Sequence, residues 1–271
     1  MKPRIIRLES CDSTNTVLGA MTDAVGGTVV ATRTQTAGRG QRGNSWESEP
    51  GRNLTFSMLL TTGWPARRQF ELSMLVALAI ADSIDAAVLS RLSAGEDSSL
   101  CCGDSEVHAA IPPAKVKWPN DIYVGDRKIC GILIEHRLSG SKLERSIAGI
   151  GININQRRFV SDAPNPVSVV NLLEEAGADA HPFDLDALLA DVAPRICTRI
   201  NTYCLAAAES GEALKAEYMS RLWRADGAEY PFALPDGTTF SAAIVDVAPD
   251  GILTLTGPRH FAFKEVSFLI D

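Results

Sequence analysis

The sequence is poor in histidine and has no closely paired cysteines, which argues against a structural metal centre or a disulfide-stapled fold. Its 271 residues include four histidines and six cysteines, and no two cysteines are spaced as CxxC. Structural zinc sites need clustered Cys and His ligands. Cys101 and Cys102 are adjacent, which is a poor geometry for an ordinary bridge. We therefore expect reduced thiols and no structural zinc site.

The chain also lacks an excess of basic residues and a long apolar run at its start. Its formal net charge of −7 argues against broad nucleic-acid binding, which requires a basic face. The first 20 residues mix acidic and polar groups with apolar ones, unlike a signal peptide or a transmembrane segment. We expect a cytoplasmic protein that binds neither nucleic acid nor membranes, in which any anion site is local.

The apolar pattern predicts an α+β domain at 1–223 and a small β-barrel at 224–271. Apolar residues make up 45% of the chain, enough for a sizeable core. From residue 228 onward, short alternating segments are separated by Pro-Asp-Gly and Gly-Pro turns, which is typical of a small barrel. Residues 90–114 are rich in Ser, Gly, Asp and Pro and predict a surface excursion. Strands are expected at 5–8, 28–32, 54–60, 115–135 (two strands around a Gly125-Asp126 turn) and 146–155, and helices at 15–21, 70–89, 184–203 and 211–223.

A Gly-rich basic loop, QTAGRGQRG, occupies residues 35–43. Residues 33–43 contain Arg33, Arg39 and Arg42 and no acidic residue, a local charge of +3 in an acidic chain. Glycines let a backbone approach phosphate oxygens and present its N–H groups to them. No GK[ST] ending follows, so the loop is not the P-loop of kinases and GTPases. It suits a triphosphate, with a solvated flexible loop as the alternative interpretation.

A second segment, KWPND, covers residues 117–121, and Lys128 follows shortly after. The proline restricts its neighbour to extended geometry and predicts a shaped turn. Asn120 and Asp121 offer oxygen ligands for Mg²⁺, and Lys117 and Lys128 offer point charges for a phosphate or carboxylate. The alternative is a charged hairpin whose lysines lie in water.

Two further segments contribute neutral hydrogen-bonding groups. Ser13, Thr14 and Asn15 lie at an expected helix start, where hydroxyls and an amide can both donate to and accept from a neutral polar ring. The alternative is an ordinary helix N-cap. The string GIGININ at 149–155 carries asparagines suited to a nucleotide base or ribose, with a buried strand end as the alternative.

In this order and spacing, the four segments resemble the catalytic domain of the biotin–protein ligases. The resemblance runs from about residue 10 to 155 and continues more loosely through the final barrel. It implies a mixed β-sheet with packed helices, like that of class II aminoacyl-tRNA synthetases, and an SH3-like C-terminal barrel. Because the pattern begins within ten residues of Met1, we expect a short form without an N-terminal DNA-binding domain.

The resemblance assigns roles residue by residue. It places Asp121 as a Mg²⁺ ligand, and Gln41 stands where many relatives have an arginine. The expected biotin-binding residues are Ser13, Thr14, Asn15, Gln35, Gly38, Arg39, Gly40, Gln41 and Lys128. The expected nucleotide-binding residues are Arg39, Arg42, Trp46, Lys117, Asn120 and Asn153, and the expected catalytic residues are Arg39, Lys117, Asp121 and Lys128.

The implied reaction is ATP-dependent activation of biotin to biotinyl-5'-AMP, followed by transfer of biotin to a lysine. The implied partner is the biotin carboxyl carrier protein of acetyl-CoA carboxylase or of a related carboxylase, and a homodimer is compatible with the sequence. ATP, Mg²⁺ and biotin are the expected small molecules, without a tightly bound prosthetic group. The alternatives are a lipoyl or octanoyl ligase of related fold and a non-catalytic sensor of biotin or nucleotide.

Overall fold

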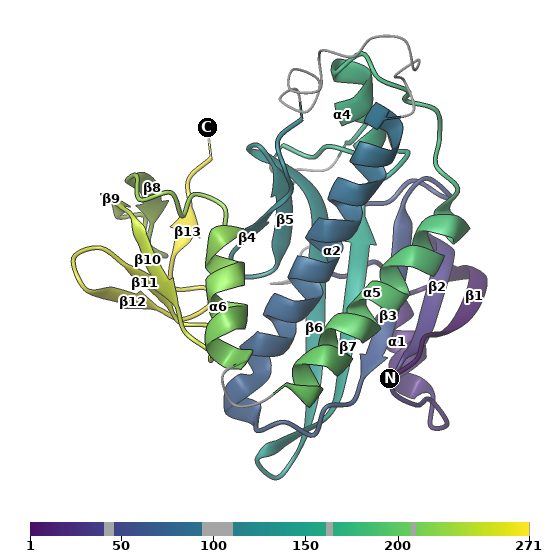
Figure 1. The fold of residues 1–271 in the computed structure, drawn as a ribbon, viewed down its shortest axis with the longest axis horizontal. Coiled ribbons are helices and arrows are strands. Elements are labelled where there is room, and N and C mark those ends of the chain that lie inside the picture. Colours follow the sequence, from purple (N-terminus) through teal and green to yellow (C-terminus); the bar gives the residue numbers. More distant parts are fainter. Residues whose placement is uncertain (41–45, 94–110, 161–164, 207–209, 271) are drawn as a thin grey trace.

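A seven-stranded mixed sheet forms the centre of the protein in a computed structural model, which describes residues 1–40, 46–93, 111–160, 165–206 and 210–270. The strand order is β1-β2-β3-β7-β6-β5-β4, and only the β1–β2 pair among these is parallel (Figure 1). The strands are β1 (Arg4–Cys11), β2 (Thr28–Gln35), β3 (Leu54–Leu60), β4 (Lys115–Lys117), β5 (Asp121–Val124), β6 (Arg127–Ser139) and β7 (Lys142–Ile152).

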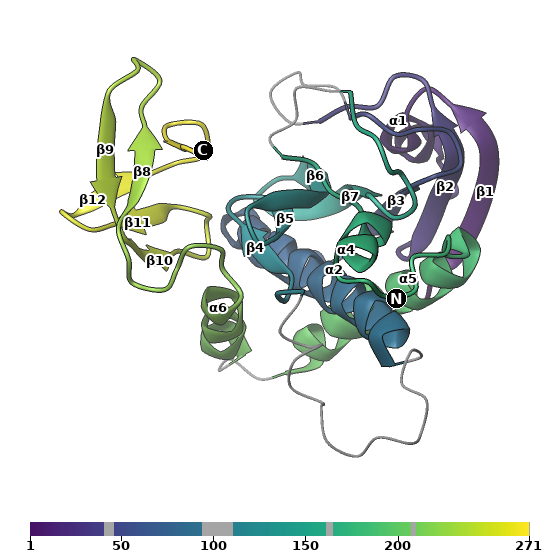
Figure 2. The same ribbon diagram turned by 90° about the horizontal axis from the view of Figure 1, so that it is seen from above.

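Helices cover both faces of this sheet. Figure 2 shows α1 on one face and the long helices α2 and α5 on the other, where they run against each other. The helices are α1 (Thr14–Ala20), α2 (Gln69–Leu92, preceded by the short helix η2 at Ala66–Arg68), α4 (Val169–Glu175), α5 (Leu185–Leu205) and α6 (Ser210–Ser220).

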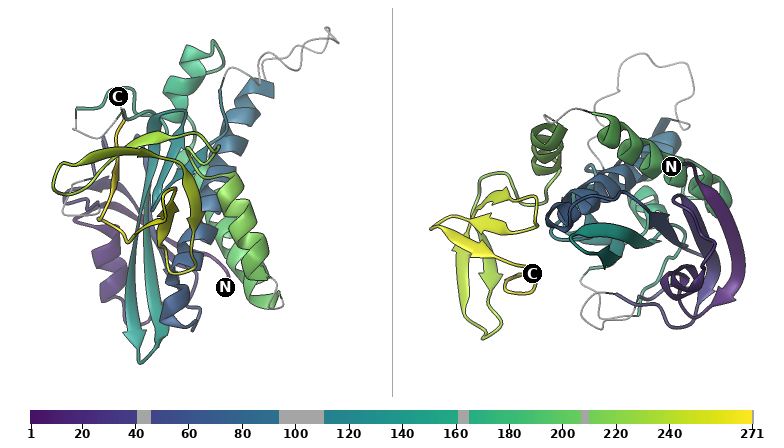
Figure 3. Two further views of the ribbon diagram at one scale, coloured as in Figure 1. Left: turned by 90° about the vertical axis from the view of Figure 1, so that its left-hand side faces the viewer. Right: turned by 90° about the horizontal axis from the view of Figure 1, so that it is seen from below.

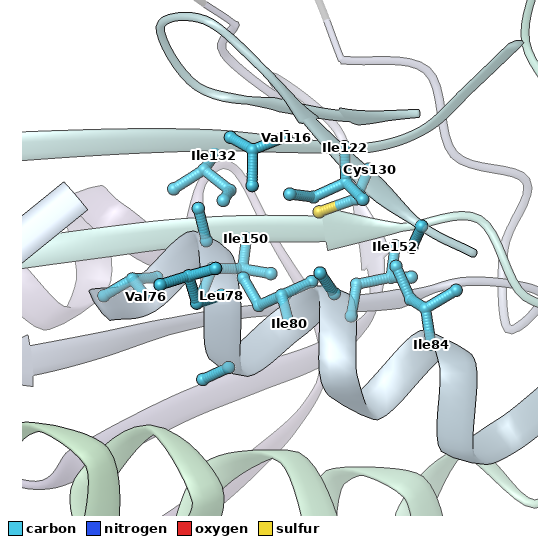
Figure 4. Close-up of a cluster of buried hydrophobic side chains, with 14 of the residues drawn as sticks. Val76, Leu78, Ile80, Ile84, Val116, Ile122, Cys130, Ile132, Ile150 and Ile152 are labelled. Atoms are coloured by element: carbon cyan, nitrogen blue, oxygen red, sulfur yellow. The ribbon is translucent and has the colours of Figure 1, made fainter. Parts of the chain in front are cut away.

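Helix α2 is apolar on nearly every side because it is packed between the sheet and α5. Its Val76, Ile80 and Ile84 lie against Ile122 and Ile150 of the sheet (Figure 4). Among the described residues, the segment Ala66–Leu92 is the one helix long and apolar enough to cross a membrane, yet most of it is buried in this core. Burial in the core accounts for its composition.

The C-terminal lobe is built from two small antiparallel sheets, ordered β13-β8-β9 and β10-β11-β12. It lies beside the β4 edge of the main sheet (Figures 2 and 3). Two indoles join the parts, since Trp118 Nε1 donates to the carbonyl of Gly251 at 3.0 Å and the Trp223 ring packs on Phe268. The strands are β8 (Tyr230–Ala233), β9 (Thr239–Ala242), β10 (Ile244–Val247), β11 (Leu253–Leu255), β12 (Arg259–Phe261) and β13 (Ser267–Phe268).

The predicted fold class, a mixed sheet with packed helices and a small all-β tail, is confirmed, while several details differ. The region 115–135 forms three strands instead of two, because the Pro119–Asn120 turn separates β4 from β5. The excursion predicted at 90–114 begins later, since α2 continues to Leu92, and residues 94–110, with Cys101 and Cys102, lie outside the described residues. The four described cysteines are free, as expected.

Helix α4 was not predicted, although its start carries a recognisable signal. Ser168 is the N-cap, and its hydroxyl accepts from the backbone N–H of Asn171, whose side-chain oxygen accepts from the backbone N–H of Ser168 in return. This is a capping box with asparagine in place of the usual Glu or Gln.

The proposed domain boundary between residues 223 and 224 stays a prediction.

The free energy of unfolding should fall as the pH drops below the usual pKa of a histidine, because burial lowers the pKa of His136 on β6. The unfolded chain then binds a proton that the folded protein resists, so stability is complete above about pH 6.5 and declines below it. Urea unfolding at pH 7.5 and pH 5.5 measures this, with His136→Asn as the non-titrating control. An equal pH dependence in both proteins would contradict the assignment.

Candidate active site

A cavity of about 560 Å³ opens on the α1 face of the sheet, between the sheet and the C-terminal lobe. All four segments singled out in the sequence reach it, together with side chains of the lobe. The predicted site residues on its lining are Ser13, Thr14, Asn15, Gln35, Arg39, Gly40, Trp46, Lys117, Asn120, Asp121, Lys128 and Asn153. Gln41 and Arg42 lie outside the described residues, so the structure leaves their predicted roles untested.

One end of the cavity is a buried corner of neutral polar groups. The Thr14 backbone N–H and hydroxyl both donate to Gln35 Oε1, at 2.9 and 3.2 Å. Ser57 on β3, which was not predicted, lies 2.6 Å from the Thr14 hydroxyl and 2.5 Å from Asn15 Oδ1. Ser13 is the N-cap of α1, but its side chain makes no capping hydrogen bond. The ordinary N-cap interpretation of this segment is therefore not supported.

Glu135 links this corner to the basic loop, and it too was missed as a site residue. Asn15 Nδ2 donates to Glu135 Oε2 at 2.6 Å, and Arg39 Nη2 lies 3.6 Å from the same oxygen. Arg39 also donates to the Thr16 hydroxyl at 3.4 Å, and about half of its side chain is exposed. Arg39 is thus at the cavity, held by Glu135 and Thr16 at the neutral end of the site.

Two of the loop predictions change in the light of these contacts. Arg33 pairs with Asp186 and is not part of the cavity lining, so it does not add to the local charge expected there. Gly38 contributes through its small size, because a Cβ at Gly38 would lie 2.7 Å from Gln35 Nε2 and 2.8 Å from the Trp46 carbonyl oxygen. Because glycine has no Cβ, the loop can pack closely on the polar corner at Gly38.

Lysine charge gathers at the other end of the cavity. Lys128 Nζ lies 2.8 Å from Asp121 Oδ1, and both side chains are less than a fifth exposed. Lys117 Nζ lies 5.3 Å from the ring centre of Tyr123 and 5.1 Å from that of Phe268. Asn120 holds the turn itself, because its side-chain amide donates to the carbonyl of Ile132. This engages one amide hydrogen and leaves the second amide hydrogen and the amide oxygen for the expected nucleotide contact.

The indole of Trp46 lies across the floor of the cavity, over two glycines that face each other in the β6–β7 pair. A Cβ at Gly151 would lie 2.3 Å from Trp46 Cε2, and one at Gly131 would lie 3.0 Å from Cζ3. Lys128 Nζ lies 6.0 Å from the centre of the Trp46 ring. The pair of glycines thus forms a slot for a flat ring.

Three buried polar atoms on the lining have no hydrogen-bond partner among the described residues. They are Trp46 Nε1, Thr55 Oγ1 and Asn153 Oδ1, and Thr55 was not predicted. Leaving such a group unpaired costs about 1–3 kcal/mol, so a bound ligand that supplied partners would be favoured. Asn153 is anchored by its Nδ2, which donates to the carbonyl of Val167 at 3.1 Å, and this leaves its oxygen for a ligand.

Asn155, at the end of the same string, has a structural role. Its side-chain amide donates to the carbonyl of Phe183 and accepts from the Phe183 N–H, at 2.9 and 2.8 Å. We expect Asn155→Ala to lower the free energy of unfolding by about 2 kcal/mol, because two backbone groups lose their partners, while ligand affinity is retained. Urea unfolding and calorimetry on the same variant check this; a loss of ligand affinity at unchanged stability would contradict it.

For a metal ion, the site offers little protein ligation. Among the described residues, no group of three or more His, Cys, Asp or Glu side chains is placed to hold one. Mg²⁺ on a nucleotide needs only one or two carboxylates, since phosphates and waters supply its other ligands. Asp121 provides one such carboxylate on the lining, which would suit a Mg²⁺ ion carried by a nucleotide.

This fold and site define a class: a mixed-sheet protein whose cavity has a neutral hydrogen-bonding corner at one end and lysines at the other. Comparison with known proteins agrees. The profile of the Biotin/lipoate A/B protein ligase family matches residues 8–153. The chain belongs to this family, and the predicted resemblance to the biotin–protein ligases is confirmed.

Individual relatives cover the chain to different extents. A biotin--[acetyl-CoA-carboxylase] ligase of Paracoccus denitrificans is 28% identical over 257 residues, 93% of each chain. The bifunctional ligase/repressor BirA of Bacillus spizizenii is 33% identical over 138 residues, a stretch that spans only 36% of that relative. The structure of the Aquifex aeolicus biotin protein ligase in complex with biotin and ATP superposes with a TM-score of 0.71 over the full length of both chains, at 23% identity, which shows the shared fold.

Proposed function

We propose that this protein activates biotin with ATP to biotinyl-5'-AMP and then transfers biotin to a lysine of a biotin carboxyl carrier protein. One observation carries the proposal: a single cavity joins the polar corner of Thr14, Asn15 and Gln35 to the lysine end of Lys117 and Lys128. Biotin has a neutral ureido ring at one end and a carboxylate at the other, so its two ends match the two ends of the cavity. Relatives named as biotin ligases support the same choice.

The positive charges at the lysine end would offset the repulsion between the two anions that must react in the first step. Biotin's carboxylate must attack the α-phosphate of ATP and expel pyrophosphate. Two unit charges at about 4 Å repel by roughly 4 kcal/mol at an effective dielectric constant near 20. Lys117 and Lys128 would offset this repulsion and stabilise the negative charge on the α-phosphate oxygens in the transition state. Asp121 would hold Mg²⁺ together with the phosphates, and that ion would neutralise further phosphate charge.

The second step needs a neutral amine on the carrier. With a pKa near 10.4, roughly one lysine in two thousand is unprotonated at pH 7. Asp121 would accept a hydrogen bond from the incoming amine and hold it near the adenylate. The amine attacks the acyl carbon, AMP leaves and the amine loses a proton, so the adenylate itself is the acyl donor and no covalent bond to the enzyme is needed in either step.

Two alternatives remain to be tested against this proposal. The family includes lipoate ligases, but the dithiolane ring of lipoate has no N–H or carbonyl group to use the Thr14–Gln35 corner, which favours biotin. A non-catalytic sensor would bind biotin or nucleotide without transfer. The finer expectations from the sequence stay proposals: a cytoplasmic enzyme, with no affinity for nucleic acid or membranes, that is compatible with a homodimer.

A transfer assay tests the function directly. Purified protein, ATP, Mg²⁺, biotin and a biotin carboxyl carrier domain should yield carrier with one added biotinyl group by mass spectrometry. Carrier with its target lysine changed to arginine is the control, and lipoate replaces biotin in a parallel reaction. Adenylate formation without transfer would favour the sensor, and transfer of lipoate alone would favour the lipoyl ligase.

Arg39→Ala should slow adenylate formation about tenfold or let the adenylate escape before transfer. The reason is that Arg39 ties its loop to Thr16 and Glu135 beside the polar corner, and this loop would hold biotin in place and keep water from the mixed anhydride. Single-turnover kinetics and chromatography of released biotinyl-5'-AMP measure the two effects. Arg33→Ala is the matched control, since Arg33 pairs with Asp186 outside the cavity; equal effects of the two substitutions would contradict the role of Arg39.

A further inference from the structure

The ammonium group of Lys117 lies between two aromatic rings that belong to different parts of the protein. Its Nζ is 5.3 Å from the ring centre of Tyr123, on β5 of the main sheet, and 5.1 Å from that of Phe268, on β13 of the C-terminal lobe. Both distances are within the range of about 6 Å over which a cation is attracted to a ring face. Lys117 and Phe268 both line the cavity.

Phe268 is itself held firmly by other rings. Its ring centre lies 4.8 Å from Phe232, which is fully buried, and 5.5 Å from Trp223, which in turn lies 5.2 Å from Tyr123. Such tilted pairs are favourable packing arrangements of aromatic side chains. A continuous row of rings therefore runs from the core of the lobe to the main sheet, and the Lys117 ammonium contacts both Tyr123 and Phe268 in it.

A lysine needs this kind of support if its charge is to act at a fixed point. Its four-carbon stem is flexible, and a half-buried lysine tends to extend its ammonium into water. A second ring face, supplied from outside the main sheet, restricts the ammonium to the cavity. We infer that Phe268 is a positioning residue, which fixes the Lys117 ammonium toward the phosphates of the nucleotide.

This inference rests on the proposed function for its effect on catalysis, but the contact itself can be tested without that function. Phe268→Leu removes the ring face and keeps an apolar side chain, and Phe268→Tyr keeps the face. Phe240→Leu is a matched control, because Phe240 is a ring of the same lobe that stacks on Phe232 and lies under a different cation, Arg259, outside the cavity. Thermal unfolding of each variant shows whether the lobe stays folded.

Trace labelling with acetic anhydride, followed by mass spectrometry, measures the contact. Lys117 should react severalfold faster in Phe268→Leu than in the wild-type protein, relative to exposed Lys142, and at the wild-type rate in Phe268→Tyr and Phe240→Leu. An unchanged rate in Phe268→Leu would overturn the inference. This result stands even if the wild-type protein proves not to make an adenylate.

Kinetics then test the positioning role. Phe268→Leu should raise the KM for ATP about three- to tenfold, with a smaller change in kcat, and Phe268→Tyr should restore most of the loss. In a Lys117→Met background the same substitution should have almost no further effect, because the charge it positions is gone. Equal effects of Phe268→Leu with and without Lys117 would show a merely structural role and overturn the inference.

Discussion

Lys128→Met is expected to slow adenylate formation by about a hundredfold or more while leaving biotin's ring contacts in place. Lys128 is less than a fifth exposed, so its charge acts with little screening by water, and removal of one such group from a reacting centre commonly costs a factor of about 10²–10³. Methionine keeps a similar length and apolar stem. Single-turnover formation of biotinyl-5'-AMP measures the rate.

The ion pair with Asp121 complicates this prediction, because Lys128→Met also leaves a largely buried carboxylate without its partner. The double variant Lys128→Met with Asp121→Asn removes that unpaired charge. It should recover the stability lost in the single variant without recovering the rate. Lys142→Met, at an exposed lysine in the β6–β7 hairpin, should change neither quantity. Recovery of the rate in the double variant would show that Lys128 acts only through stability.

The residues of the site differ in how far the sequence alone could reveal them. The loop, the KWPND turn and Asn153 were found because they form strings with unusual composition. The Lys128–Asp121 contact was not predicted. It depends on a register shift in the β5–β6 pair, and no local sequence pattern specifies that shift. No sequence pattern indicated a site role for Phe268, because that role arises from the way the lobe packs on the main sheet.

Thr55 and Ser57 were missed although a signal was present. They alternate with Leu54, Phe56 and Met58 in β3, so the polar residues share the face opposite the α2 core. In a strand that is buried on both faces, polar residues on one face indicate hydrogen-bonding partners there. Strand β3 was predicted with its present bounds, and applying this alternation to it would have added Thr55 to the cavity lining and Ser57 to the polar corner behind it.

Gly151→Ala should weaken biotin binding at least tenfold with little loss of stability. The new methyl group would lie 2.3–2.6 Å from three atoms of the Trp46 indole, closer than a Cβ can approach, so the indole must leave the glycine slot. Its loop is tied to the fold at this point by the hydrogen bond from the Trp46 N–H to the carbonyl of Gly38, which the shift would strain. Isothermal titration calorimetry with biotin and urea unfolding measure the two expected effects.

Two further variants separate displacement of the indole from obstruction by the methyl group itself. Gly19→Ala adds the same group in α1 at an ordinary 3.6 Å from Ile147 Cδ1 and should bind biotin as the wild-type protein does. In Gly151→Ala combined with Trp46→Ala, the clash is absent, so biotin should bind more tightly than in Gly151→Ala alone. Equal weak binding by the single and double variants would mean that the methyl group fills space that the ligand itself requires. Wild-type affinity in Gly151→Ala would contradict the slot altogether, because the new methyl group would then have left the Trp46 indole and its loop undisturbed.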